Sequence, residues 1–139
     1  MQPLLSIKDL SVKFATARGK VQALDGVSLS VEAGETLAIV GESGSGKSVT
    51  ALSILGLLGD SGQVTNGAIE FDGENLVDVK EARLREIRGN RIAFIFQEPM
   101  SSLNPVLTIG TQVAEPIWLH RKKPWPEAFA QAGELLQRV

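Results

Sequence analysis

Hydrophobic and polar residues alternate in two segments near the N-terminus of the chain. The first segment contains Leu10, Val12 and Phe14, and the second is 27–31. Alternation with a period of two residues is typical of a strand that buries one of its faces. Because a turn-like segment, 17–20, separates the two, the pattern predicts a small antiparallel β layer at the N-terminus.

Two later segments are apolar without alternating, namely 36–40 and 91–96. Continuous apolar runs of this length are typical of strands that are covered on both faces in a parallel sheet. The sequence therefore predicts two buried parallel strands at these positions. A further short strand is predicted over 67–71, where an Asp-Gly turn follows.

A helix is predicted over 49–58, directly after a glycine-rich loop. Its apolar residues recur with the spacing of one helical face. They are Ala51, Ile54, Leu55 and Leu58. A second, charged helix is predicted over 79–88, because Gly89 follows it as a stop signal.

Two more helices are predicted towards the C-terminus. Thr108 suits the N-cap of the first, because its side-chain oxygen can accept a hydrogen bond from an N–H group of the first turn. Pro116 is predicted to end or kink that helix. Pro126 is predicted to be the first residue of the last helix. One face of the last helix is predicted to consist of Phe129, Ala132, Gly133 and Leu136.

The glycine-rich loop carries the candidate chemistry. It fits the phosphate-binding pattern G-x-x-x-x-G-K-[ST]. Its residues are Gly41, Glu42, Ser43, Gly44, Ser45, Gly46, Lys47 and Ser48. Glycine permits positive φ values, so that successive N–H groups can surround an anion, and the following helix adds its first, unpaired N–H groups. The pattern predicts nucleotide binding, with Lys47 on the β- and γ-phosphates and the Ser48 hydroxyl on Mg²⁺.

A glycine-rich turn that ends in Lys-Ser by chance is the alternative to a phosphate-binding loop. The predicted strand before the loop and the predicted helix after it argue against chance, because the motif requires both.

Composition and charge narrow the functional classes. The length of 139 residues suits one domain, and 43% hydrophobic with 22% charged residues is ordinary for a soluble globular protein. The formal net charge of -2 gives no general reason to expect a nucleic acid partner, and the absence of cysteine excludes disulfides and thiolate metal sites. No signal segment or membrane-spanning stretch is predicted. We therefore expect a soluble, cytoplasmic chain, unless a partner recruits it to a membrane.

Three stretches make the chain resemble the ATPase subunits of ABC transporters, and most closely those of oligopeptide and dipeptide importers. They are 41–50, which contains the loop, 23–29, which reads Ala-Leu-Asp-Gly-Val-Ser-Leu, and 96–105, which reads Phe-Gln-Glu-Pro-Met-Ser-Ser-Leu-Asn-Pro. The stretch 96–105 is the most specific of the three. The resemblance covers essentially the whole chain.

The resemblance implies an α/β fold of the P-loop NTPase class, ABC type. It implies a parallel sheet with an antiparallel β layer at the N-terminus and the start of a helical subdomain. On this basis 1–139 is an incomplete ABC ATPase domain. Residues 1–97 are the β layer and P-loop core up to the Q-loop, and 98–139 are the start of the helical subdomain.

The resemblance also implies roles for individual residues. Phe14 stands at the position of the aromatic residue that stacks on adenine, with a role in the core of the β layer as the alternative. Gln97 matches the Q-loop glutamine, which binds Mg²⁺ or orients water, with a solvent-facing strand end as the alternative. Val49 stands where many members have Thr, so a hydroxyl contact to the α-phosphate is lost and the backbone N–H remains.

The implied nucleotide-binding set is therefore Phe14, Gly41, Glu42, Ser43, Gly44, Ser45, Gly46, Lys47, Ser48 and Val49. The implied Mg²⁺ ligands are Ser48 and Gln97, and Gln97 is the one residue with an implied catalytic role.

Several motifs of the family do not occur in this sequence. They are the signature Leu-Ser-Gly-Gly-Gln, the Walker B aspartate, the catalytic glutamate and the switch histidine. No Asp follows Asp78, and His120, the one histidine, follows the Q-loop too soon and is expected to be a surface residue. We expect the chain alone to bind Mg-ATP weakly and to hydrolyse little or none of it. We also expect marginal stability or aggregation, because the predicted parallel strands lack neighbours.

The resemblance implies ATP and Mg²⁺ as ligands, and transmembrane permease subunits and a second ABC ATPase domain as partners. It implies a peripheral location at the cytoplasmic face of the inner membrane and a role in powering solute import, with peptides as the first candidate. A truncated, non-catalytic nucleotide-binding fragment is one alternative. A further alternative is another P-loop kinase or a GTPase, although the guanine-reading motif Asn-Lys-x-Asp does not occur in the sequence.

Overall fold

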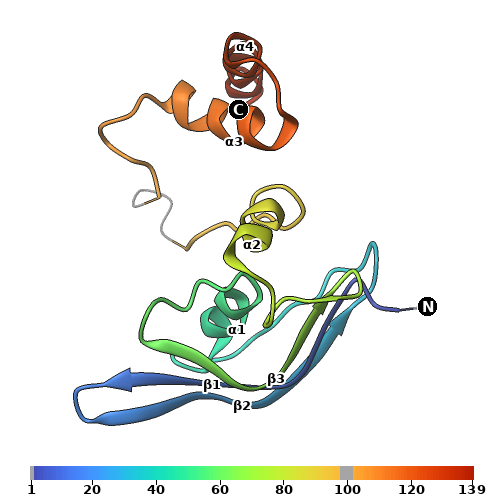
Figure 1. Cartoon of the computed structure of the whole chain (residues 1–139), viewed down its shortest axis with the longest axis vertical. Helices are drawn as coiled ribbons and strands as arrows, with labels where there is room; N and C mark the ends of the chain where they lie inside the picture. Colours follow the sequence, from blue (N-terminus) through green and yellow to red (C-terminus); the bar gives the residue numbers. More distant parts are fainter. Residues whose placement is uncertain (1, 98–101) are drawn as a thin grey trace. The chain divides into compact units, whose positions relative to one another are not determined.

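The computed structural model describes residues 2–97 and 102–139. These residues form two compact units, which divide between Leu84 and Arg85 inside helix α2 (Glu81–Ile87). The first unit contains a sheet and helix α1, and the second contains a pair of longer helices (Figure 1). The sequence predicts a boundary between two ATPase subdomains after residue 97. That boundary stays a prediction, because the two compact units describe the compactness of this chain and not the subdomains of an ATPase.

The first unit is built on a four-stranded antiparallel sheet with the strand order β2-β1-β3-β4. Its strands are β1 (Leu5–Thr16), β2 (Gly19–Val31), β3 (Gly62–Phe71) and β4 (Glu74–Asn75). β1 pairs with both β2 and β3, so that Phe14 lies between Val21 and Gly62. The predicted antiparallel β layer is confirmed, and the short strand that was predicted over 67–71 begins earlier, at Gly62.

Strand β1 has a β-bulge at Asp9, where the register of both of its pairings shifts. Asp9 has a φ of 49°, and its N–H donates to the Ser28 hydroxyl at 2.9 Å. On the other side, a Cβ atom at Gly67 would lie 2.4 Å from the carbonyl oxygen of Lys8. The bulge therefore depends on two residues of other strands, because the Ser28 hydroxyl accepts the Asp9 N–H and Gly67 leaves room for the Lys8 carbonyl. The alternation of the sequence does not reveal the bulge.

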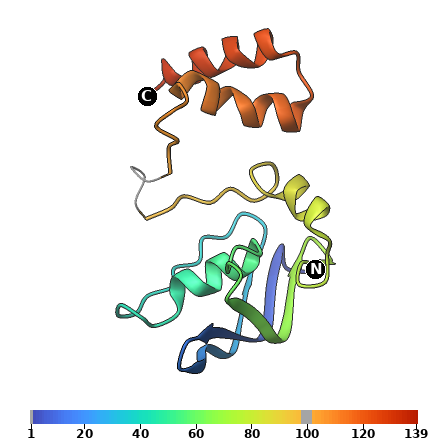
Figure 2. The same cartoon turned by 60° about the vertical axis from the view of Figure 1, so that its left-hand side comes forward.

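Helix α1 (Lys47–Ile54) lies beside the sheet in both overall views (Figures 1 and 2). It is shorter than the predicted helix 49–58, because the chain turns at Leu55 and at Gly56, whose φ is 62°. Of the predicted apolar stripe, Leu55 alone is fully buried. The buried residues inside α1 are Thr50 and Ser53, and their hydroxyls donate to backbone carbonyls one turn earlier. The apolar core of the first unit consists of Ile7, Leu10, Val12, Leu24, Leu55, Ile69, Phe71, Leu76 and Leu84.

The segments 36–40 and 91–96 form no strands, so these two predictions are wrong for the described structure. Val40 is 89% exposed and Ile95 is 93% exposed, which is the opposite of the predicted burial. A parallel strand is stable only when neighbouring strands satisfy its backbone groups and helices cover its faces. Among the described residues, the parallel pairing of this region is limited to an isolated bridge between Arg88 and Ile92.

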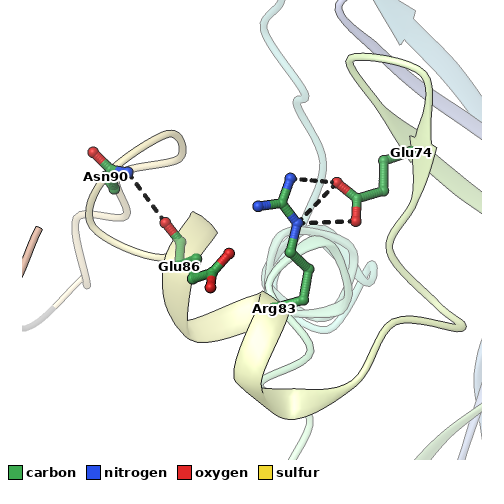
Figure 3. Close-up of polar contacts among 4 residues, drawn as sticks. All are labelled: Glu74, Arg83, Glu86 and Asn90. Atoms are coloured by element: carbon green, nitrogen blue, oxygen red, sulfur yellow. Dashed lines mark hydrogen bonds and ion pairs between the residues drawn. The ribbon is translucent and has the colours of Figure 1, made fainter.

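An ion pair connects α2 to strand β4. The Arg83 guanidinium donates to both carboxylate oxygens of Glu74, from Nε at 3.0 and 3.2 Å and from Nη2 at 2.8 Å (Figure 3). The side chains of Arg83 and Glu74 are 42% and 35% exposed, and ion pairs with such exposure contribute about 1 kcal/mol or less to the free energy of unfolding. Farther along, the Asn90 side chain donates to the Glu86 carbonyl at 3.3 Å (Figure 3). The charged helix that was predicted over 79–88 is thus confirmed in a shorter form.

The second unit contains α3 (Ile109–Arg121) and α4 (Trp125–Leu136), which pack against each other as a helical hairpin. Small and branched side chains form its core, namely Val113, Ala114, Ile117, Ala128 and Ala132. Of the predicted face of α4, Ala132 is buried, whereas Phe129 is 47% exposed and its ring packs against Gly110 of α3. Among the residues that the structure describes, no helix is both long and apolar enough to cross a lipid bilayer.

The ends of the hairpin helices largely follow the sequence signals. The Thr108 side chain accepts a hydrogen bond from the N–H of Thr111 at 3.2 Å, which confirms Thr108 as the N-cap of α3. Pro116 lies inside α3, which continues to Arg121, so the helix does not end there. Helix α4 begins at Trp125, one residue before the predicted Pro126.

Candidate functional site

The loop 41–48 adopts a backbone conformation that its glycines make possible. Gly44 has a φ of 84°, and Gly46, the N-cap of α1, has a φ of 93°. Residues other than glycine are strained at such angles, so these two positions tolerate side chains poorly. The conformation turns the chain directly from the loop into the first turn of α1.

Two glycines of the loop also lie close to neighbouring side chains. A Cβ atom at Gly46 would lie 2.6 Å from Cδ2 of Leu24, a residue of β2 that is 4% exposed. A Cβ atom at Gly41 would lie 2.6 Å from the Ser45 hydroxyl oxygen. The antiparallel sheet therefore supports the loop from one side through Leu24. No pattern in the sequence indicates this role, although Leu24 lies in the stretch 23–29 that carries the resemblance.

The Lys47 ammonium group lies on the loop itself. Its Nζ donates to the carbonyl oxygen of Gly41 at 2.7 Å, to that of Glu42 at 2.8 Å, and to the hydroxyl of Ser45 at 3.2 Å. These three contacts hold a positive charge at the N-terminal end of α1. A phosphate oxygen is the kind of acceptor that competes well for such a group, because charge-assisted hydrogen bonds are stronger than neutral ones.

The first turn of α1 adds further donors to the same region. Its N-cap is Gly46, which has no side chain that could accept a hydrogen bond from the N–H groups of the first turn. Thr50 fixes the start of the helix, because its N–H and its hydroxyl both donate to the Gly46 carbonyl, at 2.8 and 3.0 Å. Ser48 is exposed, and Val49 contributes to this turn through its backbone. The donors and the cation at this site fit the phosphate groups of a nucleotide.

Phe14 is half-buried in β1, and its ring packs against the backbone at the start of β3. A Cβ atom at Gly62 would lie 2.8 Å from Cε1 of this ring. Glycine at position 62 therefore makes room for the aromatic side chain. The contact assigns Phe14 a packing role within the first unit, and its stacking on adenine stays a prediction.

Gln97 is exposed and lies at a bend after the irregular segment 93–96. It belongs to the second unit, whereas Phe14 and the loop 41–48 belong to the first. The residues that follow it in the most specific stretch, Glu98 to Ser101, lie outside the described residues. The roles of Gln97 as a water-orienting residue and as a Mg²⁺ ligand therefore stay predictions.

His120 was expected at the surface, and it is in fact half-buried near the end of α3. Its Nε2 atom lies 3.4 Å from the position of a Cβ atom at Gly89, so the imidazole covers the turn after α2. The histidine thus has a packing role inside the second unit.

A recess of about 440 Å³ lies at the opposite end of α1 from the loop. Its lining includes Ser53, Asp60, Gln63, Leu76 and Leu84. No residue of 41–48 lines it. The candidate phosphate site is therefore an open loop with backbone donors and not this recess. Among the described residues, no cluster of three or more His, Cys, Asp or Glu side chains could hold a metal ion.

The chain is similar to known proteins of one family over most of its length. Residues 24–139 match the family described as ABC transporter. The chain is 47% identical to the dipeptide transport ATP-binding protein DppD of Lactococcus lactis subsp. cremoris, over 99% of this chain and 40% of that protein. It is 46% identical to the oligopeptide transport ATP-binding protein OppD of Haemophilus influenzae, over 100% of this chain and 43% of that protein.

The fold is similar to a solved structure described as the dimeric, post-hydrolysis state of the ATP-binding cassette MJ0796 bound to ADP and Pi. The TM-score is 0.81 and the identity 28%, over 96% of this chain and 56% of that chain. This similarity confirms the predicted α/β, ABC-type P-loop class. The chain spans about two fifths of the length of the two curated relatives. From the match over residues 24–139 and the similarity to this cassette, the chain belongs to the ABC transporter family.

Proposed function

We propose that this chain is the ATP-binding part of an ABC ATPase that powers peptide import. The observation that carries the proposal is the geometry of the loop 41–48, which places the Lys47 ammonium and the uncapped first turn of α1 at one site. The printed names of the relatives support peptides as the cargo class, because they describe dipeptide and oligopeptide transport ATP-binding proteins.

Each residue of the site has a distinct role in the proposal. The N–H groups of the loop and of the first turn, from Gly41 to Val49, surround the phosphates. Lys47 exchanges its contacts with the Gly41 and Glu42 carbonyls for the β- and γ-phosphate oxygens. Phe14 stacks on the adenine ring, an interaction that every purine face permits. Gln97 orients the attacking water.

The residues of the chain also fit a magnesium ion that is bound mainly by the nucleotide. Mg²⁺ binds one or two protein oxygens together with phosphates and water, and when bound it neutralises charge on the phosphates. The Ser48 hydroxyl is the direct ligand that the loop offers, and Gln97 is the second oxygen donor.

We infer that residues 1–139 carry groups that bind ATP but not all of the groups that hydrolyse it. The sequence contains no Walker B aspartate, no catalytic glutamate and no signature motif, so it lacks the groups that polarise water and close over the γ-phosphate. We infer that hydrolysis requires those groups from elsewhere, together with a second ABC ATPase domain. Transmembrane permease subunits would then hold the assembly at the cytoplasmic face of the membrane.

The test measures the affinity of the 139-residue chain for a fluorescent ATP analogue with Mg²⁺. Lys47→Ala removes a charge-assisted contact worth about 1.5–3 kcal/mol, so we expect the affinity to fall roughly 10- to 100-fold. Lys20→Ala is the matched control, because Lys20 is an exposed cation in β2 and its loss changes the net charge equally. Equal affinity of the two variants would overturn the proposal.

The same titration separates the alternative functions. Competition by ATP over GTP supports the ABC assignment, whereas a preference for GTP supports a GTPase. Phosphoryl transfer to a soluble acceptor would support a kinase. Binding of ATP without hydrolysis by the isolated chain agrees with a non-catalytic nucleotide-binding part. Turnover that tracks the protein and vanishes in Lys47→Ala would contradict the separation of binding from hydrolysis.

A further inference from the structure

Three aromatic side chains gather where α3 turns into α4. The rings of Trp118 and Trp125 make an edge-to-face contact across the turn, with centroids 6.1 Å apart, and Phe129 lies 6.4 Å from Trp125. All three remain between 40% and 47% exposed. We call Trp118, Arg121, Lys122, Trp125 and Phe129 the aromatic turn. An exposed group of large aromatic rings marks an interaction surface more often than a packing accident.

The core of the hairpin does not explain these aromatic residues. Ala114, Ile117, Ala128 and Ala132 are the buried core of the hairpin, and none of the three rings belongs to it. The Phe129 ring packs against Gly110 of α3, where a Cβ atom would lie 3.1 Å from its Cζ, but all three rings remain partly exposed outside this core. Their two indole groups combine an apolar body with an N–H group at the edge, which suits a boundary between water and an apolar phase.

The turn between the helices carries a local positive charge. Arg121 and Lys122 are exposed, and among the described residues no carboxylate lies within ion-pair distance of either. Lys123 differs, because its ammonium group pairs with Glu127. Lys122 adopts a φ of 51° as the C-cap of α3, and the two cations follow Trp118 and precede Trp125 in the sequence. The chain as a whole has a net charge of -2, so this charge is a local feature.

We infer that the aromatic turn docks directly on an anionic lipid surface. Cations attract the surface and aromatic rings enter its headgroup layer, and the combination of both on one short turn is the pattern of an interfacial anchor. A protein groove would complement the rings equally well. It would not by itself account for two exposed cations on the same turn, and the lipid surface accounts for both. The inference is independent of the proposed phosphate-binding loop 41–48, which belongs to the first unit.

The intrinsic fluorescence of the chain tests this surface selectively. The chain contains two tryptophans and no tyrosine, and both tryptophans belong to the aromatic turn. We expect vesicles of equal parts phosphatidylglycerol and phosphatidylcholine to shift the emission of the 139-residue chain to shorter wavelength. Vesicles of phosphatidylcholine alone should leave it unchanged. Added salt should reverse the shift, because it screens the cations.

Charge variants identify the residues that bind. Arg121→Gln combined with Lys122→Gln should weaken vesicle affinity roughly thirtyfold, since each cation near an anionic surface contributes on the order of fivefold. Arg18→Gln combined with Lys20→Gln is the matched control, because it removes the same charge from the exposed β1–β2 turn. It should bind vesicles as the parent does. Lys47→Ala should also keep vesicle binding, which separates this inference from the nucleotide proposal.

Four results would overturn the inference. They are no shift with anionic vesicles, an equal shift with phosphatidylcholine alone, an equal loss in both double variants, and a shift that follows protein concentration without any vesicles. The last result would assign the aromatic turn to contact with a second copy of the chain. Substituting exposed residues preserves the hairpin core, and an unchanged circular dichroism spectrum of each variant verifies this.

Discussion

Within the first unit, the loop 41–48 and the preceding segment 36–40 differ in how far their sequence patterns determine their structure. The loop has a defined geometry, with Gly46 at a φ of 93° and three hydrogen bonds from the Lys47 ammonium. The segment 36–40 has an equally clear sequence pattern but forms no strand, and Val40 is 89% exposed. The difference lies in how far along the chain the residues are that each segment must contact. The loop finds its contacts within a few residues and in Leu24, whereas a parallel strand needs neighbours on both sides.

The largest expected effect compares a residue of the sheet with one of the exposed segment. Ile69→Ala should lower the free energy of unfolding of the first unit by about 2–5 kcal/mol, because Ile69 is fully buried in β3. Val40→Ala should change it by less than about 0.5 kcal/mol, as is usual for exposed positions. Hydrogen exchange of β1 amides, read by mass spectrometry, measures both effects in the first unit.

An equal loss in Val40→Ala would show that 36–40 is a buried strand in solution, as its sequence pattern predicts. The same samples test the predicted marginal stability. Exposed apolar segments without strand partners favour association, so we expect the chain to aggregate at concentrations at which a stable domain stays monomeric. A cooperative melt of a monomer at high temperature would contradict that expectation.

The second prediction sharpens the comparison at the loop itself. Gly46→Ala should lower stability by about 1–3 kcal/mol and abolish measurable nucleotide binding, because it combines a strained φ with a Cβ atom 2.6 Å from Leu24 Cδ2. Gly34→Ala is the control for strain alone, since Gly34 has a φ of 81° and open space around it. It should lower stability by about 1–2 kcal/mol and keep nucleotide binding.

A double variant separates the two causes at Gly46. Leu24→Ala removes the atom that the new Cβ would contact, so it should restore part of the nucleotide affinity lost in Gly46→Ala. If Leu24→Ala restores nothing, the backbone strain alone disables the loop, and the sheet does not support it in the way that the contact indicates. Nucleotide affinity is the deciding measurement here, because Leu24→Ala itself removes buried surface.

These contrasts explain how much of the molecule the sequence predicts. Features with local causes were predicted well, such as the alternating strands β1 and β2, the loop before α1, and the Thr108 cap. Features with non-local causes were not. The bulge at Asp9 depends on Ser28 and Gly67 from two other strands, and the support of Gly46 depends on Leu24 of β2. The failure at 36–40 has the same origin, since an apolar run does not specify its partner strands.

The site follows the same rule. The residues of the phosphate loop are contiguous, so the pattern alone brings them together. The structure has the helix that the pattern requires after the loop, whereas the segment 36–40 before the loop forms no strand, and the binding role of the loop stays a prediction. Phe14 and Gln97 were assigned by resemblance, and each is separated from the loop by many residues of chain. For Phe14 the structure gives a packing contact with Gly62, and for Gln97 an exposed bend. Neither position follows from local physics, so their proposed roles require the nucleotide-binding experiments.

The smallest expected effect tests a local signal in the second unit. Thr108→Ala should lower the stability of the α3–α4 hairpin by about 1 kcal/mol, because it removes the acceptor of the Thr111 N–H. Thr108→Ser keeps an acceptor oxygen at the same position and should restore nearly all of the loss. Urea unfolding followed by tryptophan emission measures the hairpin alone, since Trp118 and Trp125 are the only tryptophans of the chain. If Thr108→Ala proves neutral while Ile69→Ala is severe, the cap is redundant with the packing of Ala114 against α4. Local signals would then mark where a helix begins without determining how stable it is.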